Sequence, residues 1–197
     1  PKGRQEEVRN DLLAGKSPAG QEPVQARGGN LYFRTRAGAE GLFSKTNPGN
    51  TAWAKTTFYA PKAGTMYAMV GFDAPARSTR RCSGVPAAGE WSQCGTRIWV
   101  NGKEVKNPQT YKLAGQRRYE KHTWNSPDNE ISFDNEEFWW ARPPIPFQVK
   151  AGENTILIEQ PYTGNFQSWG VSFIPVKKSG DRWIADPSYY LKNKGEK

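Results

Sequence analysis

Residues 51–72 read TAWAKTTFYAPKAGTMYAMVGF, and they carry the clearest indication of the fold class. Residues 51–59 alternate large and small side chains, which is typical of a half-buried strand. A turn at residues 61–64 ends this strand, and residues 65–72 follow as a second long strand. We therefore expect the two segments to form a β-hairpin with alternating faces.

Further strand and turn signals follow along the chain. Asn101 and Gly102 separate two short strand-like runs, and Asn-Gly is a strong hairpin signal because both central residues need positive φ. Many short strands separated by turns predict an all-β, antiparallel sandwich or barrel. The alternation predicts that seven side chains are mostly buried in it: Trp53, Phe58, Tyr67, Trp99, Ile156, Ile158 and Phe173.

The chain divides into three parts. Residues 1–23 are expected to be a linker or the end of a preceding domain, with a short helix at residues 6–13 before several Gly and Pro residues. Residues 24–176 hold the predicted sandwich. Residues 177–197 are expected to form a partly disordered C-terminal extension, in which residues 183–191 are apolar enough to pack back on the domain.

The net charge of +9 is compatible with an anionic partner or with solubility alone. A polyanion site would rest on five arginines, but the chain carries no nucleic-acid-binding motif, so nucleic acid is not an expected partner. Insertion into a membrane is not expected either, because no apolar run approaches the length that a spanning helix needs. The five arginines are Arg77, Arg80, Arg81, Arg117 and Arg118.

Cys82 and Cys94 bracket a turn-rich loop, and we expect them to form a disulfide rather than remain two free thiols. A bridge across so short a loop would contribute about 3 kcal/mol in the chain-entropy model. It would place the protein in an oxidising compartment: the periplasm, the cell surface or the exterior. A zinc site is not expected because His122 is the only histidine, and nothing in the sequence indicates another metal or a cofactor.

The sequence offers little for catalysis. His122 lacks a nucleophile elbow such as Gly-x-Ser-x-Gly. Asp134, Glu136 and Glu137 could supply a pair of glycosidase carboxylates. However, consecutive acidic residues in a loop are more often solvated or paired with a cation such as Arg142. We therefore expect this segment not to be an enzyme.

Several motifs of the chain together indicate a resemblance to a known family. Two are the more specific: Arg80-Arg81 followed by Gly89-Glu90-Trp91, and EEFWWARP at residues 136–143. The runs IWVNGKE at 98–104 and KAGENTIL at 150–157 recur across galactose-binding-like jelly rolls. GGNLYFR at residues 28–34 completes the set. Together, over roughly residues 28–176, these motifs resemble the C-terminal β-sandwich of Bacteroides-type β-N-acetylhexosaminidases of glycoside hydrolase family 20.

The resemblance implies a galactose-binding-like jelly roll that buttresses the catalytic domain of a parent hydrolase. The catalytic signature of that enzyme family is an adjacent Asp-Glu pair, which is absent from this sequence. The catalytic residues of such a parent would therefore lie outside this chain. The cysteine pair departs from the family's pattern, so the expected compartment rests on the cysteines.

An alternative role is recognition of a glycan through exposed tryptophans. Aromatic rings stack on the apolar faces of sugar rings, while carboxylates, amides and arginines bind the hydroxyls. Trp139 and Trp140 point to opposite faces if they lie in a strand, so one is expected in the core and the other exposed. The candidate sugar-binding residues are Trp91, Trp124, Trp139, Trp140, Arg142 and Glu137.

Overall fold

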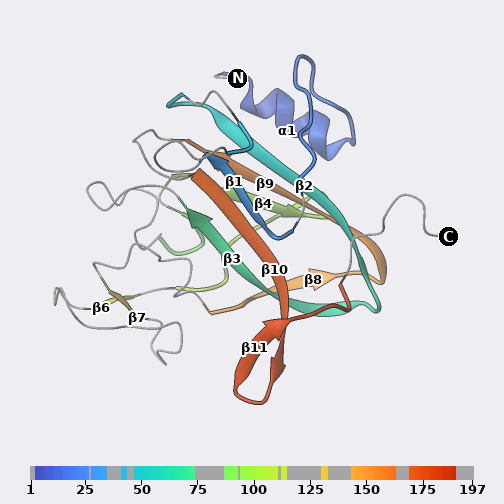
Figure 1. Cartoon of the computed structure of the whole chain (residues 1–197), viewed down its shortest axis with the longest axis vertical. Helices are drawn as coiled ribbons and strands as arrows, with labels where there is room; N and C mark the ends of the chain where they lie inside the picture. The colour runs from blue at the N-terminus through green and yellow to red at the C-terminus, as the bar shows by residue number, and fades with distance from the viewer. Residues whose placement is uncertain are drawn as a thin grey trace.

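The computed structural model is a two-layer β-sandwich with one short helix (Figure 1). It describes residues 3–26, 28–34, 41–43, 47–73, 87–92, 94–110, 112–114, 130–132, 143–162 and 169–189. The predicted all-β sandwich is therefore confirmed.

Two antiparallel sheets form the layers. Sheet A has the strand order β1 (Asn30–Arg34), β10 (Trp169–Ser179), β3 (Gly64–Asp73) and β8 (Ile145–Val149), and β11 (Arg182–Ala185) also pairs with β10. Sheet B has the order β2 (Thr51–Ala60), β9 (Gly152–Pro161), β4 (Arg97–Val100) and β5 (Lys103–Val105). A small parallel pair consists of β6 (Lys112–Ala114) and β7 (Glu130–Ser132).

The core lies between the two sheets. Alternate residues of each strand point into it, because successive side chains of a strand face opposite sides. In β3 these are Met66, Ala68, Val70 and Phe72, all buried. They belong to one apolar cluster that also includes Ile156 and Ile158 of β9, Ile98 and Val100 of β4, Phe147 of β8 and Trp169 of β10.

The predicted hairpin of β2 and β3 is wrong. The two strands follow one another directly but lie in different sheets: β2 pairs with β9, and β3 lies between β10 and β8. Residues 61–63 thus cross from one layer to the other. The same holds for β8 and β9, which are joined through residues 150–151 at the same end of the sandwich. Alternation of side chains identifies the buried face of a strand but not the strand with which it pairs. This is why the pairing of β2 with β3 was wrongly predicted.

The Asn101-Gly102 hairpin is confirmed. The φ angles of these two residues are +51° and +80°, and β4 pairs with β5 across the turn. The turn is also joined to β9, because the Asn101 side chain accepts a hydrogen bond from the backbone N–H of Thr155 at 3.0 Å and donates one to Asn154 Oδ1 at 2.8 Å.

Six of the seven side chains predicted to be mostly buried are at least half-buried. Trp53 and Phe173 are half-buried, whereas Phe58, Trp99, Ile156 and Ile158 are fully buried. The prediction for Tyr67 is wrong, because this side chain is 41% exposed. Large side chains occur on both faces of the strand formed by residues 65–72, so alternation alone does not identify the buried face. The face that packs in the core is the one that includes Met66.

The predicted helix is confirmed as α1 (Gln5–Leu13), and it packs on the outer face of sheet B. Val8 is buried, and the Lys55 ammonium donates a hydrogen bond to the Leu12 carbonyl at 2.6 Å. A helix of nine residues is marginal by itself, so these contacts stabilise it. No helix within the described residues is long and apolar enough to cross a membrane.

Candidate functional site

Most of the predicted site residues lie outside the described part of the chain. Trp91 and Cys94 are described, and six others are not: Cys82, Trp124, Glu137, Trp139, Trp140 and Arg142. The roles proposed for those six, including the Cys82–Cys94 bridge, stay predictions. Cys94 is half-buried against the core, in a turn where Ser92 Oγ accepts hydrogen bonds from the N–H groups of Cys94 and Thr96.

The prediction that Trp91 could be an exposed sugar platform needs correction. Its side chain is 2% exposed and stacks on Phe147, with ring centroids 5.9 Å apart and planes 7° from parallel. The indole N–H donates to the Val105 carbonyl at 2.8 Å. A backbone bridge between Gly89 and Asn107 ties the loop to the sandwich and turns Trp91 inward. Trp91 is a core residue and has no face free for a ligand.

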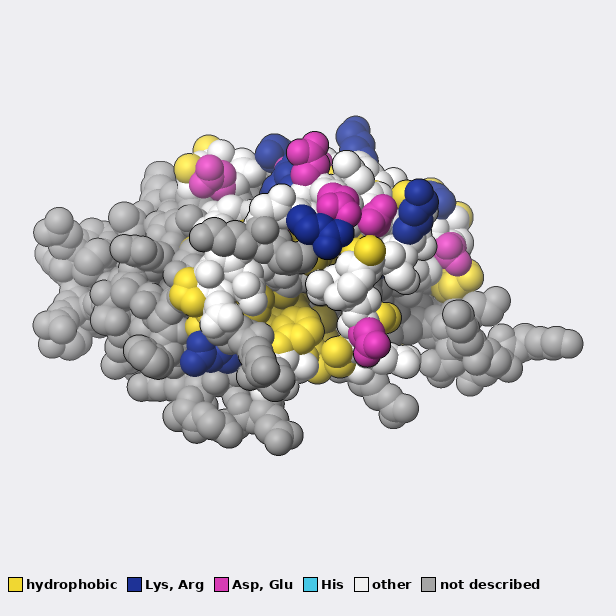
Figure 2. Space-filling view, turned by 90° about the horizontal axis from the view of Figure 1, so that it is seen from above, with side chains coloured by type: hydrophobic (Ala, Val, Ile, Leu, Met, Phe, Trp, Pro, Cys, Tyr) yellow, Lys and Arg dark blue, Asp and Glu magenta, His cyan; other side chains and the backbone are white. Residues whose placement is uncertain are grey.

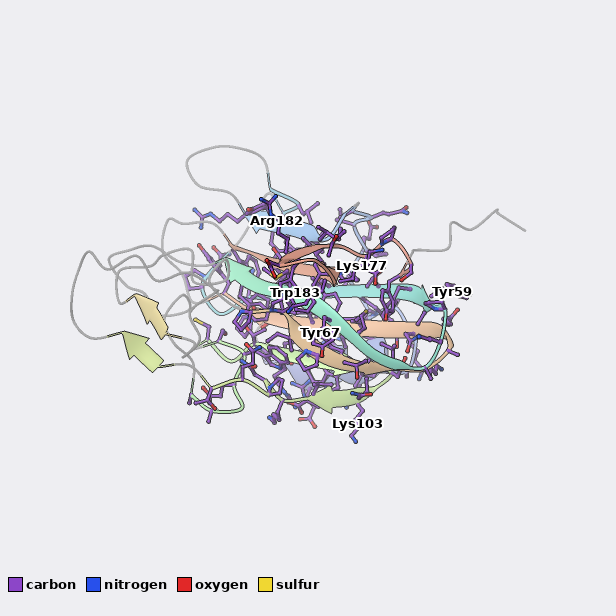
Figure 3. All side chains as sticks on the ribbon, turned by 90° about the horizontal axis from the view of Figure 1, so that it is seen from below. Tyr59, Tyr67, Lys103, Lys177, Arg182 and Trp183 are labelled. Carbon is purple, nitrogen blue, oxygen red and sulfur yellow. The ribbon has the colours of Figure 1, made fainter. Side chains whose placement is uncertain are left out.

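The outer face of sheet A presents a different aromatic pair, Tyr67 of β3 and Trp183 of β11. Their ring centroids lie 5.2 Å apart and the ring planes meet at 45°. Tyr67 is 41% exposed, and Trp183 is half-buried. Figure 3 shows these two side chains next to one another, with Lys177 beside them.

Strand register brings the pair together. Val176 of β10 lies directly opposite Tyr67 on one side and Ala185 on the other. Two residues further along, Lys178 lies opposite Trp183. Directly opposed residues of an antiparallel pair point to the same face, so the β10–β11 hairpin places Trp183 and Lys178 next to Tyr67.

Polar groups surround this pair in a shallow depression of about 550 Å³, which we call the Tyr67–Trp183 depression. The Lys177 ammonium lies 3.9 Å from Asp186 Oδ1, which also accepts hydrogen bonds from the Ser188 backbone and hydroxyl. The depression therefore joins aromatic rings to charged groups, as recognition of a polar ligand with apolar faces requires. Its full lining is Thr65, Tyr67, Val176, Lys177, Lys178, Trp183, Asp186 and Tyr189.

A second hollow, of about 260 Å³, opens between the two sheets at the β1 and β2 edge. Its wall is mostly apolar, with Leu31, Phe58, Ile158 and Phe173 among its members. Figure 2, which views the side where α1, β1 and β2 lie in Figure 1, shows hydrophobic side chains near the middle of that face. This hollow suits an apolar group, and its wall offers little to orient a polar ligand.

A third cluster holds α1 against sheet B. Glu159 is 5% exposed, and its Oε2 lies 3.1 Å from Arg9 of the helix and 3.9 Å from Arg97. Both guanidinium groups also lie over the Trp99 ring, at 5.4 and 4.8 Å from its centroid. Burial raises the pKa of Glu159, and the two arginines oppose that shift. Through Arg9, these contacts anchor α1 to sheet B.

Glu104 gives the sandwich a measurable pH dependence. Hydrogen bonds from Arg97 at 2.6 and 3.0 Å lower the pKa of Glu104 to about 2. A carboxyl group whose pKa falls on folding stabilises the fold above its unfolded pKa, and this stabilisation is lost as the pH falls from about 4.5 towards 2. Because the side chain is 26% exposed, solvent screening reduces the expected loss to about 1 kcal/mol.

Urea unfolding of the wild type and Glu104→Gln, at about pH 6 and about pH 3, measures this contribution. Between about pH 6 and about pH 3, the free energy of unfolding of the wild type should fall by about 1 kcal/mol more than that of Glu104→Gln. Equal losses in the two proteins would mean that the Arg97–Glu104 pair does not stabilise the fold in solution.

The described residues contain no group of three His, Cys, Asp or Glu side chains placed to hold a metal ion. Comparisons of the chain with protein-family models, curated proteins and solved structures found no match. The geometry of the Tyr67–Trp183 depression is therefore the main guide to function.

Sequence reasoning missed this depression, although one signal was present. Gly180-Asp181 separates residues 176–179 from residues 182–185, and Gly-Asp between two strand-like runs indicates a hairpin. Gly180 has a φ of +60°, as such a turn requires. The Gly180-Asp181 turn was overlooked because residues 177–197 were assigned to an extension. Tyr67 was not considered as a surface residue because it was assigned to the core.

Proposed function

We propose that this chain is a non-catalytic β-sandwich module that binds a glycan through the Tyr67–Trp183 depression. The aromatic pair at the surface, with Tyr67 41% exposed and Trp183 half-buried, is the observation that carries the proposal. Two large rings with their centroids 5.2 Å apart offer a ridged apolar platform at the surface. Charged side chains border it and can reach the hydroxyls of a sugar ring stacked on the platform.

The cost of exposing these rings supports a binding role. Burying an aromatic side chain of this size is worth about 1.5–3 kcal/mol, and a structural role would favour burial of both rings. Tyr67 is instead 41% exposed in the middle of β3, although its neighbours Met66 and Ala68 are fully buried. Exposed aromatic groups with a polar rim are a feature of binding surfaces.

The wider setting of the module is part of the same proposal. Its resemblance to the C-terminal domain of family 20 β-N-acetylhexosaminidases suggests a jelly-roll accessory domain of a secreted or periplasmic glycoside hydrolase. In that setting the parent enzyme supplies the catalysis. The module would hold the parent on a glycan, which raises the local concentration of substrate.

Isothermal titration with chitobiose and longer glycans tests the proposal. We expect a dissociation constant in the micromolar to millimolar range, because one aromatic platform and a few hydrogen bonds supply only about 4–8 kcal/mol. Trp183→Ala should weaken binding at least tenfold. Tyr32→Ala is the matched control, because Tyr32 is also 41% exposed on sheet A but lies outside the depression. The proposal fails if no glycan binds, or if both variants bind as the wild type does.

A buttress is the second candidate function, and the apolar hollow at the β1 and β2 edge favours it. A neighbouring domain of the parent enzyme could insert an apolar side chain between Leu31 and Phe58. In that case Phe173→Lys should destabilise the parent enzyme by more than it destabilises the isolated module, because Phe173 lines the hollow as well as packing on Phe147.

A further inference from the structure

We propose that the ligand of the Tyr67–Trp183 depression is an acidic glycan whose anionic group is bound by Lys178. This inference rests on the glycan-binding function proposed above and specifies the class of sugar. It follows from the register of β10 and β11, from the charge of the rim and from the kinds of hydrogen-bonding groups that the rim offers.

The register places a cation beside the platform. Lys178 lies directly opposite Trp183, and both point to the same face as Tyr67. Opposed side chains of an antiparallel pair have Cβ atoms about 4.5–5.5 Å apart. A sugar ring stacked on Trp183 therefore holds its ring substituents within reach of the Lys178 ammonium.

The charge of Lys178 is available to a ligand. Lys177 lies 3.9 Å from Asp186, so these two charges largely compensate each other. Lys106, Arg97 and Arg9 likewise have carboxylate partners. Within the described part of the chain, no Asp or Glu is recorded in an ion pair with Lys178. Arg182 (Figure 3) and the adjacent Asp181, both exposed at the tip of this hairpin, carry opposite charges that largely compensate each other.

The charged groups of the rim offer hydrogen-bond donors more readily than acceptors. An ammonium group only donates, and the rim contains two of them, Lys177 and Lys178. Its carboxylate, Asp186, is 13% exposed and already accepts two hydrogen bonds from Ser188. Neutral sugar hydroxyls both donate and accept, whereas carboxylates and sulfates only accept. The rim thus matches an anionic sugar better than a neutral one, and the net charge of +9 favours its approach.

Matched oligosaccharides test the inference. The probes are hyaluronan hexasaccharide, which carries carboxylates, and chitohexaose, which is neutral. Dextran sulfate and dextran form a second pair that distinguishes sulfate from carboxylate. At low salt, at least one anionic probe should bind ten times or more tightly than its neutral partner, and added salt should reduce the difference. Equal binding within both pairs would overturn the inference but leave glycan binding itself intact, whereas absence of binding to all four probes would end both proposals.

Variants locate the effect. Lys178→Gln should lower the affinity for the preferred anionic probe at least fivefold, whereas Lys103→Gln, an exposed lysine at the far end of sheet B, should not. Trp183→Ala should also weaken binding of the anionic probe, because recognition needs the platform as well as the charge. If anionic probes bind equally well to Trp183→Ala, the attraction is general to the basic surface and the inference is wrong.

Discussion

Replacing Trp91 by alanine is expected to lower the free energy of unfolding by about 3–5 kcal/mol, the range typical of truncating a buried tryptophan. Trp91 is 2% exposed, stacks on Phe147 and meets Phe72 edge to face with centroids 6.5 Å apart. The change would leave a cavity between the sheets. It would also remove the indole donor that binds the Val105 carbonyl.

Urea unfolding measures the change, and Trp183→Ala is a control that removes the same side chain from a half-buried position at the surface. The control should cost less than about 1 kcal/mol, because it leaves no internal cavity. The two variants should thus separate stability from binding: Trp91→Ala unfolds readily, and Trp183→Ala stays folded but loses the glycan. Similar unfolding energies for the two variants would contradict the assignment of Trp91 to the core.

The second large effect is expected at Asn154, where an alanine should cost about 2–4 kcal/mol, since it leaves several buried partners unsatisfied. The side chain is fully buried, and its Nδ2 donates to the carbonyls of Lys150 at 2.8 Å and Gly152 at 3.0 Å. Its Oδ1 accepts hydrogen bonds from the Lys150 N–H and from Asn101 Nδ2. One amide thereby joins the β8–β9 crossing to the β4–β5 turn.

Gln148→Ala is the control for Asn154→Ala, because Gln148 makes only an exposed side-chain hydrogen bond to Thr65 in the described structure. It should change the free energy of unfolding by less than about 0.5 kcal/mol. Thermal unfolding followed by circular dichroism would compare the two variants. An Asn154→Ala protein as stable as the control would show that water or a local shift satisfies the freed carbonyls.

The sequence predicted the layers better than their connections. Alternation identified Ile156 and Ile158 as core residues because β9 carries small or polar groups on its other face over part of its length. Alternation wrongly placed Tyr67 in the core because β3 has large side chains on both of its faces. The Asn101-Gly102 turn was predictable since its positive φ angles select those residue types.

The candidate site was harder to predict than the fold. Trp183 and Tyr67 are far apart in the sequence, and only the pairing of β10 with both β3 and β11 brings them together. Trp91 illustrates the opposite error, because its loop position suggested exposure whereas the Gly89–Asn107 bridge turns it inward. Both errors have one cause, since local patterns do not encode which distant strand becomes the neighbour.

The strand order also has a consequence for the time course of folding. β1 pairs with β10, and β2 pairs with β9, so the first strands of the sandwich depend on its last ones. Among the described strands, β4–β5 and β10–β11 are the pairs that form hairpins between neighbouring segments. Domains dominated by such distant pairings fold in milliseconds to seconds rather than microseconds. On the ribosome, β1 and β2 must therefore wait unpaired until β9 and β10 have been synthesised, and their apolar faces need protection from aggregation during that interval.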